Sequence, residues 1–439
     1  MYALAAADPL VLSDESRLVR RFLAWLPQAA AADRATAANA LARVYLHCEL
    51  APAVRAQAEK ALTAILDDPE LQVRRALAEA LASARAAPRH IVLALAGDNS
   101  DVSRVVLTLS PLLSDADLVD VAATGDAAAQ TAIARRPMLA APVAAALAEV
   151  GDRAAILALI ANIDADISRN VLWRVFERFR NDAETRARLA LRPDLPSSLR
   201  AAVAASTTDA LAGFATSAWL DPRRAERIAR DGREQAFIAI AAAASECDLA
   251  ELVQWLRAGE HLTVGLLLRA LVGADMRLFR QSLAEMASLP PSRVEGLLHD
   301  ARGSGFAALY RKAGMPAHLL PAFRVAFELT HKTGRNSLGV DHLLATNMLR
   351  AIEALEDSAL APVIALLWRL ASECAREDAR SIAAVAQAQT EVEPYEIARP
   401  SFEASAPPVL MLNFEPGNEN ATPTILLDEK SSVALPIAA

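Results

Sequence analysis

Cysteine and glycine are both scarce in this 439-residue sequence. Its three cysteines, Cys48, Cys247 and Cys374, lie too far apart for a metal-binding motif. Their odd number argues against a disulfide framework and favours a reducing compartment. Only 15 residues are glycine, whereas alanine and leucine are abundant, and this composition favours helices over a sheet-based fold.

Segments that would target or anchor the chain in a membrane are missing as well. The first residues, Met1 to Leu4, lack the basic region of a signal peptide. No uncharged apolar run approaches the roughly 18 residues that a membrane-spanning helix needs. We therefore expect a soluble, cytoplasmic protein without a membrane span.

Motifs that carry chemistry are also absent from the sequence. The seven histidines show no pairing with an acid at metalloprotease spacing, and no serine lies in a Gly-x-Ser-x-Gly turn. Two loops, at residues 303–305 and 331–336, could bind an anion, but a helix–helix turn and a solvated loop are the better interpretations. We expect no catalytic site, no metal and no cofactor.

The net charge of −8 is unevenly distributed along the chain. Residues 391–439 hold eight acids against Arg399 and Lys430, which gives −6 and leaves residues 1–390 near −2. A nearly neutral body lacks the basic footprint of a protein that binds duplex nucleic acid. Nucleic acid is therefore not the expected partner.

Short amphipathic segments from residue 67 to about residue 180 organise the rest of the chain. In the clearest copy, Asp68 is placed to cap a helix and Arg74 follows it by six residues; Asp98 and Arg104 repeat this offset thirty residues later. The apolar residues of this copy fall on one face of a helix: Val73, Ala76, Leu77, Ala80 and Leu81.

Two Gly-Asp pairs, at residues 125–126 and 151–152, lie 26 residues apart. We expect each glycine to end a helix in the left-handed conformation and each aspartate to cap the next helix. A period in this range, built from two helices, predicts an α-solenoid of HEAT type in which each unit buries its apolar face against its neighbours.

Several segments occur together in an order that resembles a known family. They are residues 68–81, 95–98, 110–118, 130–136 and 192–196. Together they resemble a family of HEAT-like proteins, widespread in alphaproteobacteria, that carries the label domain of unknown function 2336. The resemblance covers roughly residues 35–330. It implies an all-α bacterial protein with no assigned reaction and no catalytic residues to transfer.

We predict four regions in this all-α chain. Residues 1–66 form N-terminal capping helices near 14–30, 33–48 and 52–66, with Val44 among the inward residues of the second. Residues 67–206 form the HEAT-like repeat core. Residues 207–390 form a C-terminal helical region that begins with a polar stretch. Residues 391–439, with seven prolines, form a disordered acidic tail with two short apolar segments.

Two features are candidate partner-binding sites. Trp173 lies at the edge of an apolar helix face between Arg169 and Arg180, a composition typical of interface hot spots. A tryptophan packed against the next repeat, with solvated arginines, is the commoner alternative. In the tail, residues 408–413 and 423–428 share a pattern of proline, apolar residues and then Asn or Asp. Their candidate docking residues, which could also be a chance pattern, are Leu410, Leu412, Ile425 and Leu427.

Together these patterns favour a non-catalytic scaffold or adaptor that binds another protein through its solenoid surface, with the tail as a second candidate surface. The alternative is a nucleic-acid-binding helical-repeat protein with an Arg-lined concave face. A contiguous arginine stripe would favour that alternative, and mixed arginine and glutamate would disfavour it.

Overall fold

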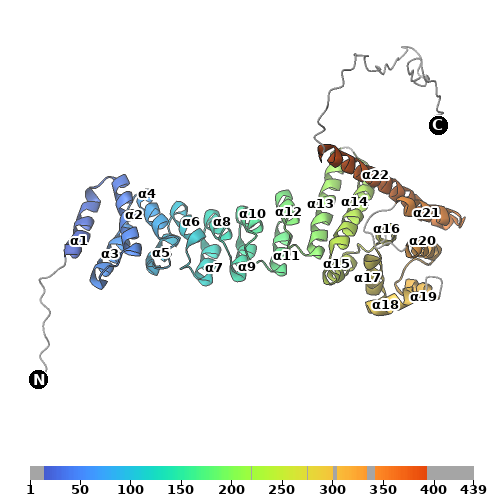
Figure 1. The fold of residues 1–439 in the computed structure, drawn as a ribbon, viewed down its shortest axis with the longest axis horizontal. Helices are drawn as coiled ribbons and strands as arrows, with labels where there is room; N and C mark the ends of the chain where they lie inside the picture. The colour runs from blue at the N-terminus through green and yellow to red at the C-terminus, as the bar shows by residue number, and fades with distance from the viewer. Residues whose placement is uncertain (1–13, 219, 274, 300–303, 334–341, 393–439) are drawn as a thin grey trace, which may run out of the picture. The chain divides into compact units, whose positions relative to one another are not determined.

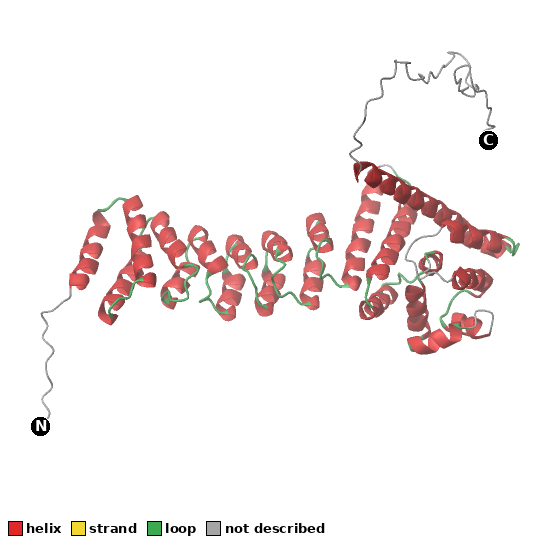
Figure 2. Cartoon of the chain, viewed as in Figure 1, coloured by secondary structure: helices red, strands yellow, loops and turns green. Residues whose placement is uncertain are grey.

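The computed structural model describes residues 14–218, 220–273, 275–299, 304–333 and 342–392. All regular secondary structure within these ranges is helical (Figure 2). The chain divides into two units, Met1–Asp378 and Ala379–Ala439, and every contact discussed below lies in the first. The predicted tail begins inside α22 (Ala361–Val392); the rest of the tail, with its four docking residues, lies outside the described residues.

The first thirteen α-helices, here called the helix stack, alternate between two layers. Even-numbered helices contact one another in succession from α2 to α12, and odd-numbered helices do so from α7 to α17. The helices of the stack (Figure 1) are α1 (Asp14–Trp25), α2 (Ala31–His47), α3 (Pro52–Ile65), α4 (Leu71–Leu81), α5 (Arg89–Ala96), α6 (Ser100–Leu109), α7 (Asp115–Thr124), α8 (Ala127–Ala134), α9 (Ala141–Val150), α10 (Arg153–Ala161), α11 (Arg169–Arg178), α12 (Ala183–Ala190) and α13 (Ser197–Ala218), with the 3₁₀ helix η1 (Leu26–Gln28) after α1.

A second set of helices follows the stack. It comprises α14 (Pro222–Ala243), α15 (Glu246–Ala258), α16 (Val264–Val272), α17 (Met276–Ala287), α18 (Pro291–Leu298), α19 (Ser304–Lys312), η2 (Ala317–Leu319), α20 (Leu320–Thr333), α21 (His342–Glu353), η3 (Ser358–Leu360) and α22 (Ala361–Val392). One hydrophobic core extends from Ala38 to Val203 and another from Ala201 to Cys374. Both cores include residues of α13. The predicted boundary between residues 206 and 207 therefore falls inside this helix, close to the residues where the two cores meet.

The helix-start aspartates behave as predicted, whereas the glycines before them do not. Asp126 and Asp152 each accept a hydrogen bond from the backbone amide three residues later, at 2.8 Å. Gly125 and Gly151 have φ values of −77° and −59°, so neither is left-handed. Glycine is required for another reason: a Cβ would lie 2.6 and 2.5 Å from the carbonyl oxygens of Val121 and Leu147.

The predicted role of Asp68 is wrong, because its carboxylate does not cap α4. The N-cap residue is Glu70, without a side-chain bond. The Asp68 carboxylate accepts the backbone amide of Glu70, the residue before α4, at 3.0 Å, and it also pairs with Arg34 of α2 at 2.8 Å. Arg74 pairs with Asp98 at 2.6 Å. Charged residues that look like local caps in the sequence therefore also connect helices that are neighbours in the even-numbered layer.

The predicted inward face holds at α4, whereas at α2 it holds for Tyr45 and fails for Val44. Val73, Leu77 and Leu81 of α4 are fully buried. In α2, however, Val44 is exposed, and the buried residues are Ala38, Ala42 and Tyr45. Small alanines allow α2 to approach α4 closely, and this packing selects a face that is not the most apolar one.

Within the described residues, one helical segment, Ser358–Ala384, is long and apolar enough to cross a membrane by length and composition. The core helix of a soluble protein passes the same test, so a single such segment is weak evidence. The predicted lack of a membrane span stays a prediction.

Candidate protein-binding surface

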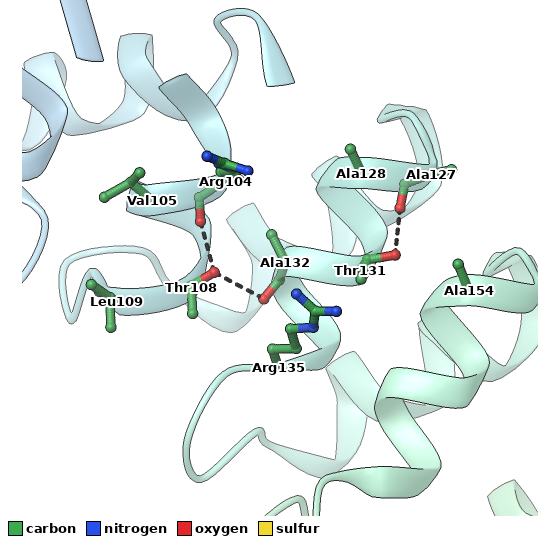
Figure 3. A pocket seen from close by; sticks show the side chains of 10 residues that line it. All are labelled: Arg104, Val105, Thr108, Leu109, Ala127, Ala128, Thr131, Ala132, Arg135 and Ala154. Atoms are coloured by element: carbon green, nitrogen blue, oxygen red, sulfur yellow. Dashed lines mark hydrogen bonds between the residues drawn. The ribbon is translucent and has the colours of Figure 1, made fainter. Parts of the chain in front are cut away.

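An open groove lies on the even-numbered layer of the stack, between α6, α8 and α10 (Figure 3). Its volume is about 590 Å³. The residues that line it are Arg104, Val105, Thr108, Leu109, Ala127, Ala128, Thr131, Ala132, Arg135 and Ala154. We call it the first groove. Alanine dominates its floor, so the backbone of a bound segment can approach the helices closely.

The two threonines of the first groove present little polarity to a ligand. The Thr108 hydroxyl donates to the carbonyl of Arg104 at 2.7 Å and approaches that of Ala132 at 3.3 Å. The Thr131 hydroxyl donates to the carbonyl of Ala127 at 2.7 Å. Because both hydroxyls bond to helix carbonyls, they need no partner in the groove (Figure 3).

Two arginines border this apolar floor. Arg104 and Arg135 are both exposed, and neither forms an ion pair with any residue that the structure describes. Leu109, also in the lining, exposes about half of its side chain. An apolar floor beside two unpaired positive charges suits a segment that combines aliphatic and acidic side chains.

The comparison with protein families decides where this chain belongs. A family described as an uncharacterised protein conserved in bacteria (DUF2336) matches residues 102–363, more than half of the chain. The chain belongs to this family. The matched range starts and ends later than the expected range of 35–330, and it contains the whole first groove. Searches of curated proteins and of solved structures found no match.

In this DUF2336 protein, the predicted site around Trp173 is partly occupied by internal contacts. Trp173 is half-buried and meets Phe176 edge to face, with 6.0 Å between ring centroids. Arg169 pairs with Asp248 of α15 at 2.9 Å and also with Glu251. Arg180 is exposed beyond the end of α11, and its carbonyl accepts hydrogen bonds from Arg186 and Ser206. Partner binding at Trp173 stays a prediction.

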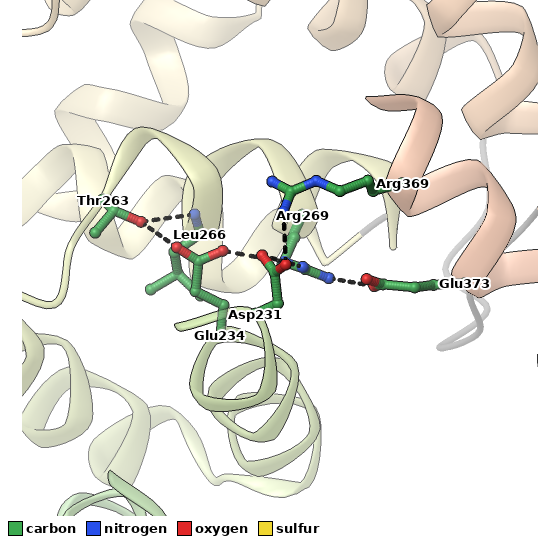
Figure 4. A network of polar contacts seen from close by, with 7 residues as sticks. All are labelled: Asp231, Glu234, Thr263, Leu266, Arg269, Arg369 and Glu373. Atoms are coloured by element: carbon green, nitrogen blue, oxygen red, sulfur yellow. Dashed lines mark hydrogen bonds and ion pairs between the residues drawn. The ribbon is translucent and has the colours of Figure 1, made fainter. Parts of the chain in front are cut away.

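Sequence reasoning missed a buried ionic network in the second set of helices (Figure 4). Arg269 of α16 is only 6% exposed. It pairs with Glu234 at 3.0 Å, Asp231 at 3.1 Å and Glu373 at 2.6 Å. Arg369 of α22 pairs with the other oxygen of Asp231 at 2.7 Å. Burial alone would lower the pKa of Arg269, but the hydrogen bond to Glu373 and the nearby carboxylates raise it.

Neighbouring residues complete this network. The Thr263 hydroxyl donates to Glu234 at 2.6 Å and accepts the amide of Leu266 at 3.0 Å, so it also caps α16. Gly265 leaves room for the carboxylate, since a Cβ there would lie 2.8 Å from Glu234 Oε1. The network connects α14, α16 and α22, and each of its carboxylates pairs with an arginine of the network, which indicates a structural role. Its sequence signal is Arg269 itself, a single charge in the apolar run Val264–Val272.

The remaining reactive side chains give no sign of a chemical site. Burial, followed by the charges of Glu373 and Asp378, raises the pKa of the Cys374 thiol to about 12, so it packs as a neutral group. Among the residues that the structure describes, no cluster of three or more His, Cys, Asp or Glu side chains could hold a metal ion.

Proposed function

We propose that this protein is a HEAT-like α-solenoid that acts as a non-catalytic scaffold or adaptor in the bacterial cytoplasm. In this proposal it binds a segment of another protein in the first groove. The alternating layers of short helices support the solenoid assignment, because the even-numbered helices from α2 to α12 and the odd-numbered helices from α7 to α17 each contact the helix two positions along.

Side-chain contacts between successive repeats support the same assignment. Arg74 pairs with Asp98, 24 residues along the chain. Arg136 donates to the carbonyl of Ser110, 26 residues back, and Arg178 to that of Gly151, 27 residues back. Equivalent contacts at such intervals are typical of stacked helix pairs.

The charges on the even-numbered layer support a protein partner over nucleic acid. Arg75 pairs with Glu79, and Arg153 pairs with Asp182 and Glu184. Mixed charges of this kind lack the continuous positive stripe that phosphate backbones require. Arg104 and Arg135 are two isolated charges beside an apolar floor, and this combination carries the proposal.

Co-purification from the native cell, followed by mass spectrometry, tests it. The wild-type chain is compared with Arg104→Glu/Arg135→Glu and with a control of equal charge change, Arg43→Glu/Arg85→Glu, in which both arginines are exposed and neither lines the groove. We expect a protein partner with wild type and control that is lost in the groove variant. Equal recovery with all three, or capture that depends on nucleic acid, would contradict the proposal.

The tail segments are a second candidate surface in this proposal. Deleting residues 405–439 is expected to weaken partner capture while leaving the helical signal and melting behaviour of residues 1–390 nearly unchanged. Undiminished capture by the shortened chain would refute a docking role for the tail.

A further inference from the structure

A second groove opens where the even-numbered layer is interrupted. Even-numbered helices contact in succession up to α12 and again from α14 to α16, but α12 and α14 make no contact of comparable extent. Figure 1 shows α13 between them, and α13 contacts both. The groove at this position has a volume of about 630 Å³. It is lined by Ala183, Arg186, Ala187, Ala190, Arg200, Val203, Ala204, Thr207, Thr208, Ala210, Leu211 and Ile240.

The lining of this second groove is mostly apolar; its charged members are Arg186 and Arg200, and it contains no acid. Ala183, Ala187 and Ala190 of α12 are exposed on one side, and Leu211 of α13, 62% exposed, extends the apolar surface on the other. Small side chains on both walls would let another helix approach to about 8–10 Å, the usual interaxial distance of packed helices.

Three arginines elsewhere in the stack share one bonding pattern, in which a single aspartate pairs with each guanidinium. Each donates Nη1 to a main-chain carbonyl and donates Nε and Nη2 to the two oxygens of one aspartate. These arginine–aspartate pairs are Arg34–Asp68, Arg74–Asp98 and Arg192–Asp194. Two others, Arg136 and Arg178, bond to main-chain carbonyls within the described residues.

Arg186 makes the bond from Nη1 to a main-chain carbonyl but lacks the paired aspartate. It is 8% exposed, and its Nη1 donates to the carbonyl of Arg180 at 2.6 Å. Its Nε is buried without a hydrogen-bond partner, and no carboxylate within the described ranges pairs with Arg186. Arg200, the other cation of the lining, already donates to the carbonyls of Ala190 and Arg192. A buried guanidinium without a counter-ion is costly, so a carboxylate supplied from the groove would be stabilising.

We propose that the second groove binds an amphipathic helix of a partner protein, with an acidic side chain that pairs with Arg186. The helix takes the lateral position between α12 and α14, its small and aliphatic face packs on the alanines, and its Asp or Glu pairs with the guanidinium of Arg186. This site shares no residue with the first groove, so the two proposals can fail independently.

A pair of synthetic peptides provides the probe. Each is a helix of about 16 residues, long enough to form helix in isolation, with Leu and Ala on one face and Lys on the other. One peptide carries a single Glu at the border of the apolar face, and its twin carries Gln there. Binding to the full chain is measured by fluorescence anisotropy. We expect the Glu peptide to bind about tenfold tighter than its twin, because a charge-assisted hydrogen bond distinguishes them.

Three variants assign the binding to the second groove. Arg186→Met is expected to abolish the difference between the peptides. Leu211→Asp changes an exposed residue, so the chain stays folded, and it is expected to weaken both peptides. Ile228→Asp is the matched control, since Ile228 of α14 is 56% exposed and lies outside the groove.

Several outcomes of these binding measurements would overturn the proposal for the second groove. Equal affinity for the two peptides, a Glu preference that persists in Arg186→Met, or no binding of either peptide would overturn the proposal. Binding that Leu211→Asp and Ile228→Asp weaken alike would overturn it too. The Arg104→Glu/Arg135→Glu variant is expected to bind the peptides as wild type does, which separates this test from that of the first groove.

Discussion

Replacing Arg269 by methionine should destabilise the second set of helices strongly. The change preserves much of the side-chain volume but removes the one cation that pairs with Glu234 among the described residues, and Glu234 is 4% exposed. Removing one partner of a buried ion pair typically costs about 3–5 kcal/mol, because the remaining charge stays buried and unpaired. Thr263 still donates to Glu234, and this bond offsets only part of the loss. We therefore expect a loss of about 3–5 kcal/mol for Arg269→Met.

The matched control is Arg369→Met. Arg369 pairs with Asp231 of the same network, but its side chain is 42% exposed, so its loss is expected to cost no more than about 1 kcal/mol. Urea denaturation followed by circular dichroism measures both variants. Adding Glu234→Gln to Arg269→Met should recover part of the stability, since it removes the stranded charge. Equal effects of Arg269→Met and Arg369→Met, or no recovery in the double variant, would refute the assignment of Arg269 as the centre of the network.

Three further predictions concern the helix stack. Leu77→Ala is expected to cost roughly 2–5 kcal/mol because Leu77 is fully buried, whereas Leu71→Ala on the exposed side of α4 should cost much less; similar denaturation midpoints for both would show that the helix phase is wrong. Trp173→Ala is expected to weaken a partner complex more than it lowers the melting temperature, and loss of stability alone would support a packing role. Bonds from Thr185 and then Arg153 lower the pKa of Asp182 to about 2, from 3.8, so its stabilising effect is complete above pH 3.8 and is lost as the pH falls through 2. The difference in melting temperature between wild type and Asp182→Asn should therefore shrink over that interval, and a constant difference would contradict the role of the carboxylate.

Much of the helical architecture could be predicted from the sequence, because its signals are local. The apolar spacing around Leu77 and the aspartates at residues 126 and 152 concern contacts within one helix or one turn. The face of α2 could not be predicted in the same way. Alanine is compatible with either side of a helix, and contact with α4 determines which side is buried.

The grooves and the ionic network depend on contacts between distant segments, and for that reason the sequence did not disclose them. In the sequence, Arg104 is marked only by its six-residue offset from Asp98, and no local pattern indicates that Arg104 and Arg135 line the same groove. Arg269 contacts Glu373, which is 104 residues away. The boundary near residue 207 was placed by polarity, whereas the structure uses α13 in both hydrophobic cores.

Photo-cross-linking in the native cell tests most directly whether the first groove binds a protein. A photoreactive residue replaces Thr131 in the groove lining, and in a control it replaces Thr36, an exposed threonine of α2 that has the same hydroxyl-to-carbonyl bond four residues back. We expect a discrete protein adduct from position 131 and none from position 36, identified by mass spectrometry. No adduct from position 131, the same adducts from both positions, or an adduct with nucleic acid would contradict the proposed function.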